Sequence, residues 1–207
     1  MRHISPAAAA ATLALLLTLG TAAAEHIRPD VWNARLALPA FVQEPALHTP
    51  IIPNGTYLPP VIAYSRTITA AQSPVLLAGT TKIPKGVTLT IDPGVSVYAL
   101  EYGDISVDGT LIVNGTNTNG VYFSTNESNI ANRNWAGIIL QPGSRARIAH
   151  ATIRHASPAI SCITGTQAQI SHSTLELGNV GLYTETPRCV MVNSTIRNTD
   201  KEVVTRQ

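Results

Sequence analysis

Short segments of alternating apolar and polar residues dominate the chain from about residue 73 onward. Residues 87–91 read Val-Thr-Leu-Thr-Ile, and residues 105–107 read Ile-Ser-Val. A period of two puts every second side chain on the same face of a β-strand. Glycine-containing turn sequences separate the segments, among them Asp-Pro-Gly at 92–94. No helical pattern of useful length follows residue 73, so this region is predicted to be all-β.

The second half of the chain repeats itself at a nearly constant interval. Segment 148–154 matches 170–176 and then 191–197, and the units begin at Ile148, Ile170 and Met191. A period of about 22 residues, with strand-forming residues and no helix, is typical of a β-solenoid. One coil cannot bury its apolar residues alone, whereas stacked coils share a continuous core. We therefore expect a parallel β-helix.

An earlier pair of segments can also be superposed. In this alignment Leu89 lies on Ile105, and Asp92 lies on Asp108. Asp-Gly and Asn-Gly sequences also form hairpin turns, so a meander of hairpins is the competing interpretation. The superposition favours stacked coils, with Asp92 and Asp108 on neighbouring rungs.

The residues before position 73 have a different pattern. Residues 1–24 combine a basic start, an apolar run and the small residues Ala22 and Ala24, as a secretory signal peptide does. The apolar run is shorter than the roughly 20 residues needed to span a bilayer. Residues 25–72 hold seven of the 14 prolines, which break any regular period. We expect a signal peptide at 1–24, a Pro-rich extended leader at 25–72 and the β-helix at 73–207.

Several of these segments together resemble secreted right-handed β-helix proteins of the pectin-lyase-like class. The resemblance rests on the segments at 87–95, 107–116 and 121–123 and on Trp-Ala-Gly-Ile at 135–138. It covers about residues 73–204. It implies a right-handed, single-stranded parallel β-helix in a class that includes polysaccharide lyases, glycoside hydrolases and surface or adhesive modules. Because a shared fold does not fix an activity, the class leaves the function open.

Charge and composition narrow the choice of partners. The net charge is only +2, and charged residues make up 13% of the chain. A net charge this small does not indicate a basic surface that would bind nucleic acid or an anionic membrane. No segment after the signal is long and apolar enough to span a membrane. We expect a secreted or cell-surface protein whose partner is a polysaccharide or another cell-surface component.

Two aspartates are the weak candidates for catalysis. If the two earlier segments stack as aligned, Asp92 and Asp108 lie about 4.8 Å apart on neighbouring rungs, where they could form an acid pair or half of a calcium site. Each aspartate also opens a tight turn, and that role explains it without a ligand. Lyases of the class need clustered arginine or lysine beside such acids, and the repeat does not place Arg145, Arg147, Arg154 or Arg188 near this pair. We favour no catalytic residues and no cofactor, with calcium as the alternative.

The repeat also aligns polar residues into rows. His150 and His172 fall at one position, followed by Asn193, and two imidazoles one rung apart are weak candidates for metal ligands. No third ligand is evident, so the favoured interpretation is a stacked polar row at a bend. Two further rows are expected, one of threonine and one of alternating charge: Thr152, Thr174 and Thr195; Arg154, Glu176 and Arg197.

Trp135 and the two cysteines complete the candidate residues. Trp135 could stack against a sugar ring, but such a residue more often covers the core, with Gly137 allowing close backbone approach. Cys162 and Cys189 are the only cysteines of the chain. In an oxidising compartment they can form a disulfide or stay apart, because pairing depends on geometry.

The leading hypothesis is a secreted or surface-exposed, non-catalytic β-helix that binds glycan or an envelope surface through its repetitive face. The second is a carbohydrate-active enzyme, a polysaccharide lyase or hydrolase of the pectin-lyase-like class. The third is a structural or assembly module that associates end to end, since an open coil is an unpaired sheet edge.

Overall fold

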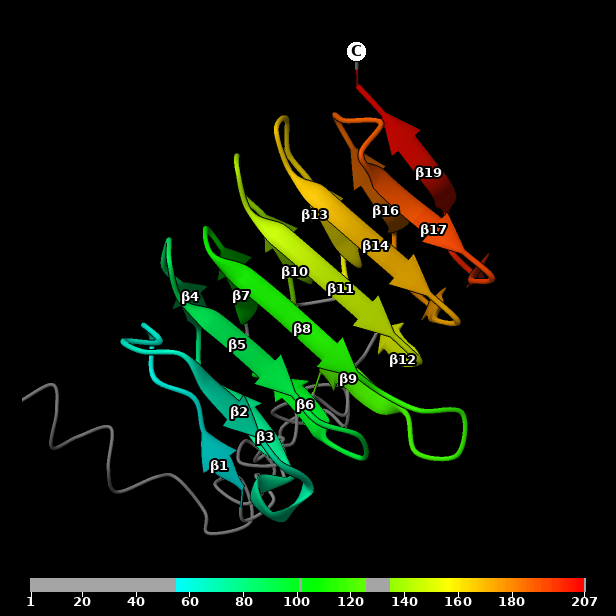
Figure 1. Cartoon of the computed structure of the whole chain (residues 1–207). Helices are drawn as coiled ribbons and strands as arrows, with labels where there is room; N and C mark the ends of the chain where they lie inside the picture. The colour runs from blue at the N-terminus through cyan, green and yellow to red at the C-terminus, as the bar shows by residue number, and fades with distance from the viewer. Residues whose placement is uncertain (1–54, 101, 126–134, 207) are drawn as a thin grey trace, which may run out of the picture. The chain divides into compact units, whose positions relative to one another are not determined.

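The chain folds into a parallel β-solenoid (Figure 1). The computed structural model describes residues 55–100, 102–125 and 135–206. In this part of the chain, successive coils each contribute one strand to each of three sheets, as β11, β12 and β13 do. The all-β parallel β-helix that the sequence predicts is confirmed.

The three sheets run along the length of the stack. Sheet A contains β1 (Thr56–Tyr57), β3 (Val75–Leu77), β6 (Ser96–Ala99), β9 (Val121–Thr125), β12 (Ala151–Arg154), β15 (Thr174–Glu176) and β18 (Thr195–Arg197). Sheet B contains β4 (Thr80–Ile83), β7 (Asp104–Val107), β10 (Ile138–Leu140), β13 (Ile160–Cys162), β16 (Val180–Thr184) and β19 (Lys201–Thr205). Sheet C contains β2 (Arg66–Ile68), β5 (Thr88–Ile91), β8 (Thr110–Asn114), β11 (Arg145–Ala149), β14 (Gln167–Ser171) and β17 (Cys189–Val192).

Pairing in the second half follows the predicted repeat. Ile148 of β11 pairs with Ile170 of β14, which pairs with Met191 of β17. Ile148 and Ile170 have no exposed surface. Like residues therefore stack on like residues, and each rung extends the apolar column of the rung below it.

The predicted alignment of Leu89 with Ile105 is wrong. Leu89 pairs with Leu111, so β5 stacks on β8. Ile105 belongs to β7, which lies in sheet B and pairs with Thr81 of β4 and Ile138 of β10. β5 and β7 are two strands of one coil. Both alternate and both end at an aspartate before a turn, so their sequences match although they lie in different sheets.

The solenoid also begins earlier than residue 73. β1, β2 and the 3-10 turn η1 (Ala70–Gln72) all precede this position. Leu58, Ile62 and Ile68 are buried in the core. Residues 55–72 therefore belong to the solenoid, because prolines interrupt the alternation here without preventing short strands. The predicted signal peptide and the rest of the Pro-rich leader lie outside the described residues.

Non-glycine residues in the left-handed conformation form the bends at both ends of the sheet A strands. His150, His172 and Asn193 have φ values of 47°, 50° and 49° at the bend between sheets C and A. His155 and Leu177 have φ values of 57° after the strands of sheet A. Left-handed backbone is unfavourable for residues with a Cβ, so stacking of the bends must compensate for this conformation.

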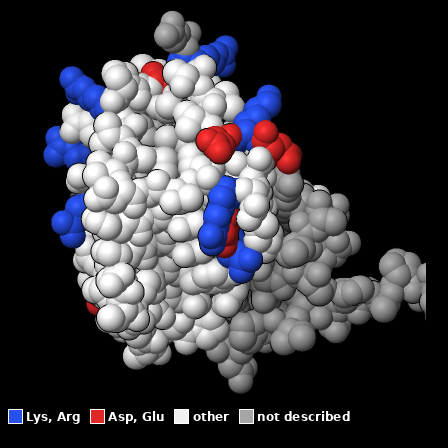
Figure 2. Space-filling model, turned by 90° about the vertical axis from the view of Figure 1, so that its right-hand side faces the viewer, with Lys and Arg blue, Asp and Glu red and all other residues white. Residues whose placement is uncertain are grey.

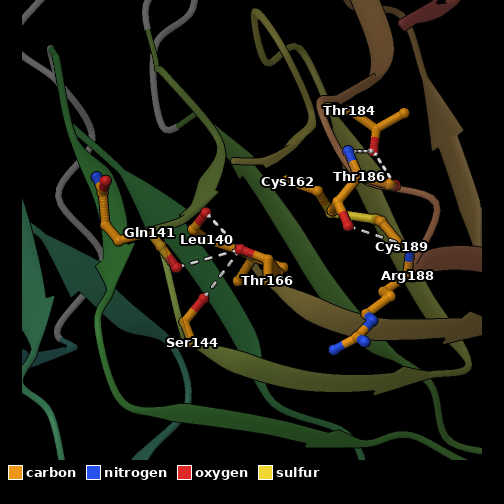
Figure 3. Close-up of a disulfide and its surroundings, with 9 residues drawn as sticks. All are labelled: Leu140, Gln141, Ser144, Cys162, Thr166, Thr184, Thr186, Arg188 and Cys189. Atoms are coloured by element: carbon orange, nitrogen blue, oxygen red, sulfur yellow. Dashed lines mark hydrogen bonds between the residues drawn. A yellow bond between two sulfur atoms is a disulfide. The ribbon is translucent and has the colours of Figure 1, made fainter. Parts of the chain in front are cut away.

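A disulfide joins Cys162 to Cys189, 27 residues apart in the sequence. Cys162 ends β13 and Cys189 begins β17, so the bond links two successive corners between sheets B and C. Figure 3 shows the corner threonines beside it. The Thr166 hydroxyl donates to the carbonyl oxygens of Leu140 and Gln141, both at 3.1 Å.

Truncating a buried rung residue should weaken the stack. Ile170→Ala is expected to lower the free energy of unfolding by about 2–5 kcal/mol, because it leaves a cavity between two stacked coils. Urea titration followed by circular dichroism measures the change. The neighbouring outward variant Gln169→Ala serves as the control and should stay within about 0.5 kcal/mol. Equal effects of the two variants would contradict the described register.

Removing the disulfide should destabilise the last coils. Closing a loop of 27 residues corresponds to roughly 3–4 kcal/mol of unfolded-state entropy. Cys162→Ala combined with Cys189→Ala should therefore lower the melting temperature, as reduction of the unmodified protein should. Dithiothreitol should not lower it further in the double variant. If dithiothreitol leaves the melting temperature of the unmodified protein unchanged, the disulfide does not stabilise the fold.

Candidate functional site

The outward side chains of sheet A form the candidate site, which we call the sheet A face. Strand pairing aligns them in rows across the coils. Thr152 lies beside Tyr122 of β9 and Thr174 of β15, and Thr174 lies beside Thr195. Arg154, Glu176 and Arg197 form the second row. Both rows were predicted from the repeat, and the register confirms their alignment.

Two tyrosines extend these rows toward the earlier coils. The rings of Tyr98 and Tyr122 are 6.0 Å apart between centroids and meet edge to face at 63°. Both side chains are half-buried. Arg154 donates from Nη1 to the hydroxyl oxygen of Tyr122 at 3.2 Å. The aromatic pair is therefore fixed in place by the charged row.

Glu176 connects the two arginines of the charged row. Its carboxylate oxygens lie 3.1 Å from Nε of Arg154 and 2.7 Å from Nε of Arg197. Glu176 is 8% exposed, whereas Arg197 is exposed. The hydrogen bond to Tyr122 is the main cause that raises the pKa of Arg154. The carboxylate thus holds both guanidinium groups in fixed positions. Each guanidinium group still has N–H donors that are free of the carboxylate.

Charged side chains of both signs lie close together on the side of the molecule shown in Figure 2, while much of that surface is uncharged. A fixed set of ring faces, hydroxyls and guanidinium groups suits a ligand with apolar C–H faces and polar edges. The sheet A face can therefore hold a polar ligand by stacking and hydrogen bonding.

The structure does not bring Asp92 and Asp108 together as an acid pair. Asp92 follows β5 in sheet C, whereas Asp108 follows β7 in sheet B. The prediction failed because it depended on stacking β5 against β7, which are strands of one coil. The backbone N–H of Asp92 donates to Ile68, and that of Asp108 donates to Ile83. Both residues thus stand at the turns that their sequences indicate.

Asp108 lies at a cavity of about 340 Å³ at the corner between sheets B and C. Its carboxylate forms an ion pair with Lys82 at 3.1 Å. The other lining residues are Pro84, Lys85, Pro142 and Gly143. Asp108 is the only carboxylate among these lining residues, so this cavity offers neither the acid pair of a glycosidase nor the several oxygen ligands of calcium.

His150 and His172 stack as flat rings. Their centroids are 4.9 Å apart and their planes differ by 13°. Asn193 continues the row, with Nδ2 3.3 Å from Nε2 of His172. Parallel rings do not direct their nitrogens toward one point, as a metal site requires. Among the described residues, no three His, Cys, Asp or Glu side chains are grouped to hold a metal ion.

Trp135 is a core residue. It is 1% exposed, and its Nε1–H donates to the backbone oxygen of Arg154 at 2.7 Å. The sugar-stacking role considered for it is therefore wrong, because the ring faces are covered. A Cβ on Gly137 would lie 2.1 Å from the carbonyl oxygen of Pro158, so this glycine permits the close backbone approach that the sequence indicated.

Sequence reasoning missed several polar contacts. The Ser124 hydroxyl lies 3.1 Å from Nδ1 of His155, and both residues are buried. Beside the end of β16, Tyr183 donates to Glu185 at 2.7 Å. This bond, followed by bonds from Thr164, lowers the pKa of Glu185. A carboxyl with a lowered pKa is ionised at neutral pH, so Glu185 is not suited to act as a general acid.

The Tyr98–Tyr122 pair was missed for a different reason. Tyr98 pairs with Ser124 of the next coil, and Val121 pairs with Ala151. In both pairs the paired residues are further apart in the sequence than the repeat of about 22 residues in the second half. The connections between strands are therefore longer in this part of the chain. A repeat search with a fixed period cannot align these strands.

Comparison with known proteins identifies the fold family. A family model described as a pectate-lyase-like beta helix domain matches residues 62–183. No curated protein and no solved structure matches the chain. In the part of the chain that the structure describes, no helix is long and apolar enough to cross a membrane.

Removing the central carboxylate should loosen the charged row. Glu176→Gln is expected to cost about 1–2 kcal/mol of unfolding free energy, because two charge-assisted contacts of a buried group are weakened. Arg197→Gln removes only the more exposed partner and should cost less than about 1 kcal/mol. Urea unfolding of both single variants and the double variant measures the coupling. If the losses of the two single variants add up to the loss of the double variant, the contact between Glu176 and Arg197 contributes nothing to stability.

Proposed function

Because the chain belongs to the family of pectate-lyase-like beta helix domains, we propose that it is a surface-exposed, non-catalytic module that binds glycan on the sheet A face. The fold supports many activities, so the proposal depends on the site. The observation that carries it is a series of side chains in contact across neighbouring coils, which we call the contact row: Tyr98, Tyr122, Arg154, Glu176 and Arg197.

The chemistry of this row matches a carbohydrate chain. Sugar rings have apolar C–H faces that pack on tyrosine and hydroxyl edges that bond to charged groups. The row of Thr152, Thr174 and Thr195 adds hydroxyl groups on neighbouring rungs. Rungs recur about every 4.8 Å, so an extended polymer lying along the stack meets equivalent contacts repeatedly.

Location outside the cell is part of the proposal. The signal-like residues 1–24 support secretion. The disulfide between Cys162 and Cys189 supports an oxidising compartment. A polysaccharide or another cell-surface component is therefore the proposed partner.

The enzyme alternative depends on the cavity beside Asp108. It would require this carboxylate to leave its ion pair with Lys82 and a second catalytic group to act with it. We place it second, since the lining residues supply no other carboxylate. Release of unsaturated or reducing sugars from any polysaccharide, abolished in Asp108→Asn, would favour the enzyme over the binding module.

Loss of the aromatic pair should weaken glycan binding. Polysaccharides are first screened for binding and turnover, and the tightest neutral ligand is titrated by calorimetry. Tyr122→Ala and Tyr98→Ala should each lower affinity roughly tenfold, because stacking on an aromatic ring contributes about 1–1.5 kcal/mol. Tyr122→Phe keeps the ring but loses the bond to Arg154, so its affinity should fall between those of the unmodified protein and Tyr122→Ala.

Tyr64→Ala is the matched control. Tyr64 is 68% exposed and lies between β1 and β2, outside the strands that carry the row. It should leave affinity unchanged. A screen without any bound carbohydrate, or equal losses in Tyr64→Ala and Tyr122→Ala, would contradict glycan binding on the sheet A face.

A further inference from the structure

A second polar surface covers sheet C. Its centre is formed by Arg145 and Arg147 of β11, which pair with Gln167 and Gln169 of β14. Arg188 precedes β17, and its carbonyl oxygen accepts from the N–H of Ala168, which sets it beside Gln167 on the next rung. Figure 3 shows the Arg188 side chain pointing away from the disulfide. We call the three arginines and two glutamines the arginine face.

The arginine face is exposed and carries charge of one sign. All five of its side chains are exposed. In Figure 2 basic side chains project from the left-hand edge, which is the front of Figure 1, where the strands of sheet C lie. The six strands of sheet C contain no aspartate or glutamate. The strands of sheets A and B, in contrast, include acids such as Glu176 and Asp104 beside their basic residues.

Two of the carboxylates that flank sheet C are held by groups other than these arginines. Asp92 lies just past the end of β5, and Asp108 is paired with Lys82. Glu185 is held by Tyr183 and Thr164. Arg147 itself donates to the amide oxygen of Asn114 at 3.0 Å, a neutral partner that leaves its charge in place.

The strand pairing places the three arginines close together. Arg145 and Arg147 stand two residues apart on one strand, a separation of roughly 6.6 Å. Arg188 lies two rungs from Arg145, a separation of roughly 9.6 Å. Toward the N-terminus the same row continues as Thr110 and Thr88. The face therefore offers three cations on the first and third of three successive rungs, with amide and hydroxyl groups beside them.

We propose that the arginine face binds a linear polysaccharide whose sugars carry sulfate esters. A cluster of cations on neighbouring rungs complements a polymer that carries several oxyanions, and the glutamines and threonines can bond to its hydroxyl groups. Guanidinium presents a fork of N–H donors to such oxygens. The site is on a different sheet from the one that carries the proposed glycan row, so the two bind independently.

The choice of arginine favours sulfate over carboxylate. The arginine face contains three arginines and no lysine. Guanidinium is more weakly hydrated than an ammonium group, and a sulfate monoester is more weakly hydrated than a carboxylate. The two weakly hydrated ions lose little hydration when they meet, so their contact remains favourable on an exposed surface.

Three polymers with one backbone test the proposal: dextran, carboxymethyl dextran and dextran sulfate, the last two at equal charge density. Calorimetry on the full chain should show dextran sulfate bound at least about fivefold more tightly than carboxymethyl dextran. The triple variant Arg145→Gln, Arg147→Gln and Arg188→Gln should lower affinity for dextran sulfate roughly tenfold or more. All three residues are exposed, and circular dichroism checks that the fold is kept.

The control variant Lys85→Gln, Lys201→Gln and Arg206→Gln changes the net charge equally but lies outside the arginine face. Its affinity should stay within about twofold of the unmodified protein. If both triple variants lose the same affinity for dextran sulfate, net charge alone explains the loss and the proposal is overturned. Equally tight binding of carboxymethyl dextran would overturn the choice of sulfate.

Tyr122→Ala separates this proposal from the glycan site of sheet A. It should leave the binding of dextran sulfate unchanged while it weakens binding of a neutral glycan. If Tyr122→Ala abolishes dextran sulfate binding, the anion lies on sheet A and the arginine face has no such role. If only neutral glycan binding is absent, the arginine face retains its role and the proposed function alone fails.

Discussion

The hydrogen-bonded ladder between neighbouring coils is the constraint on which the rest of the structure depends. Parallel strands stack at about 4.8 Å and keep one register for each sheet. A residue is therefore placed directly beside its counterpart in the next coil, as Ile148 is beside Ile170. Inside the stack this alignment builds apolar columns. Outside it, the same alignment brings Arg154, Glu176 and Arg197 into one row.

Each sheet consequently acquires a chemical character of its own. Sheet A carries tyrosine, threonine and paired charges, in which Glu176 balances two guanidinium groups. Sheet C carries arginines that lack such an acid, with glutamines beside them. Apart from Arg188, which lies in the turn before β17, both surfaces are built from strand residues. Their recognition chemistry follows from what one rung places beside the next.

The fold was predictable from the sequence wherever the period was constant. The units that begin at Ile148, Ile170 and Met191 align in the structure as they do in the sequence. The stacking of β5 on β7 was wrong because the two strands share a pattern within one coil, and local alternation carries no information on which sheet a strand joins. The Tyr98–Tyr122 pair was not predicted, because connections of unequal length change the number of residues from one coil to the next. The arginine face was not predicted because the total charge averages over all faces, whereas the strands of sheet C contain basic residues and no acid.

The disulfide has a consequence for how the stack comes apart. Each coil of a solenoid contacts mainly its two neighbours, so such a protein can unfold one coil at a time, starting from the terminal coil. Cys162 and Cys189 join two successive corners covalently, so the last coils cannot separate individually. They form one cooperative block, and slow amide exchange would extend through the block as a plateau rather than decline from rung to rung.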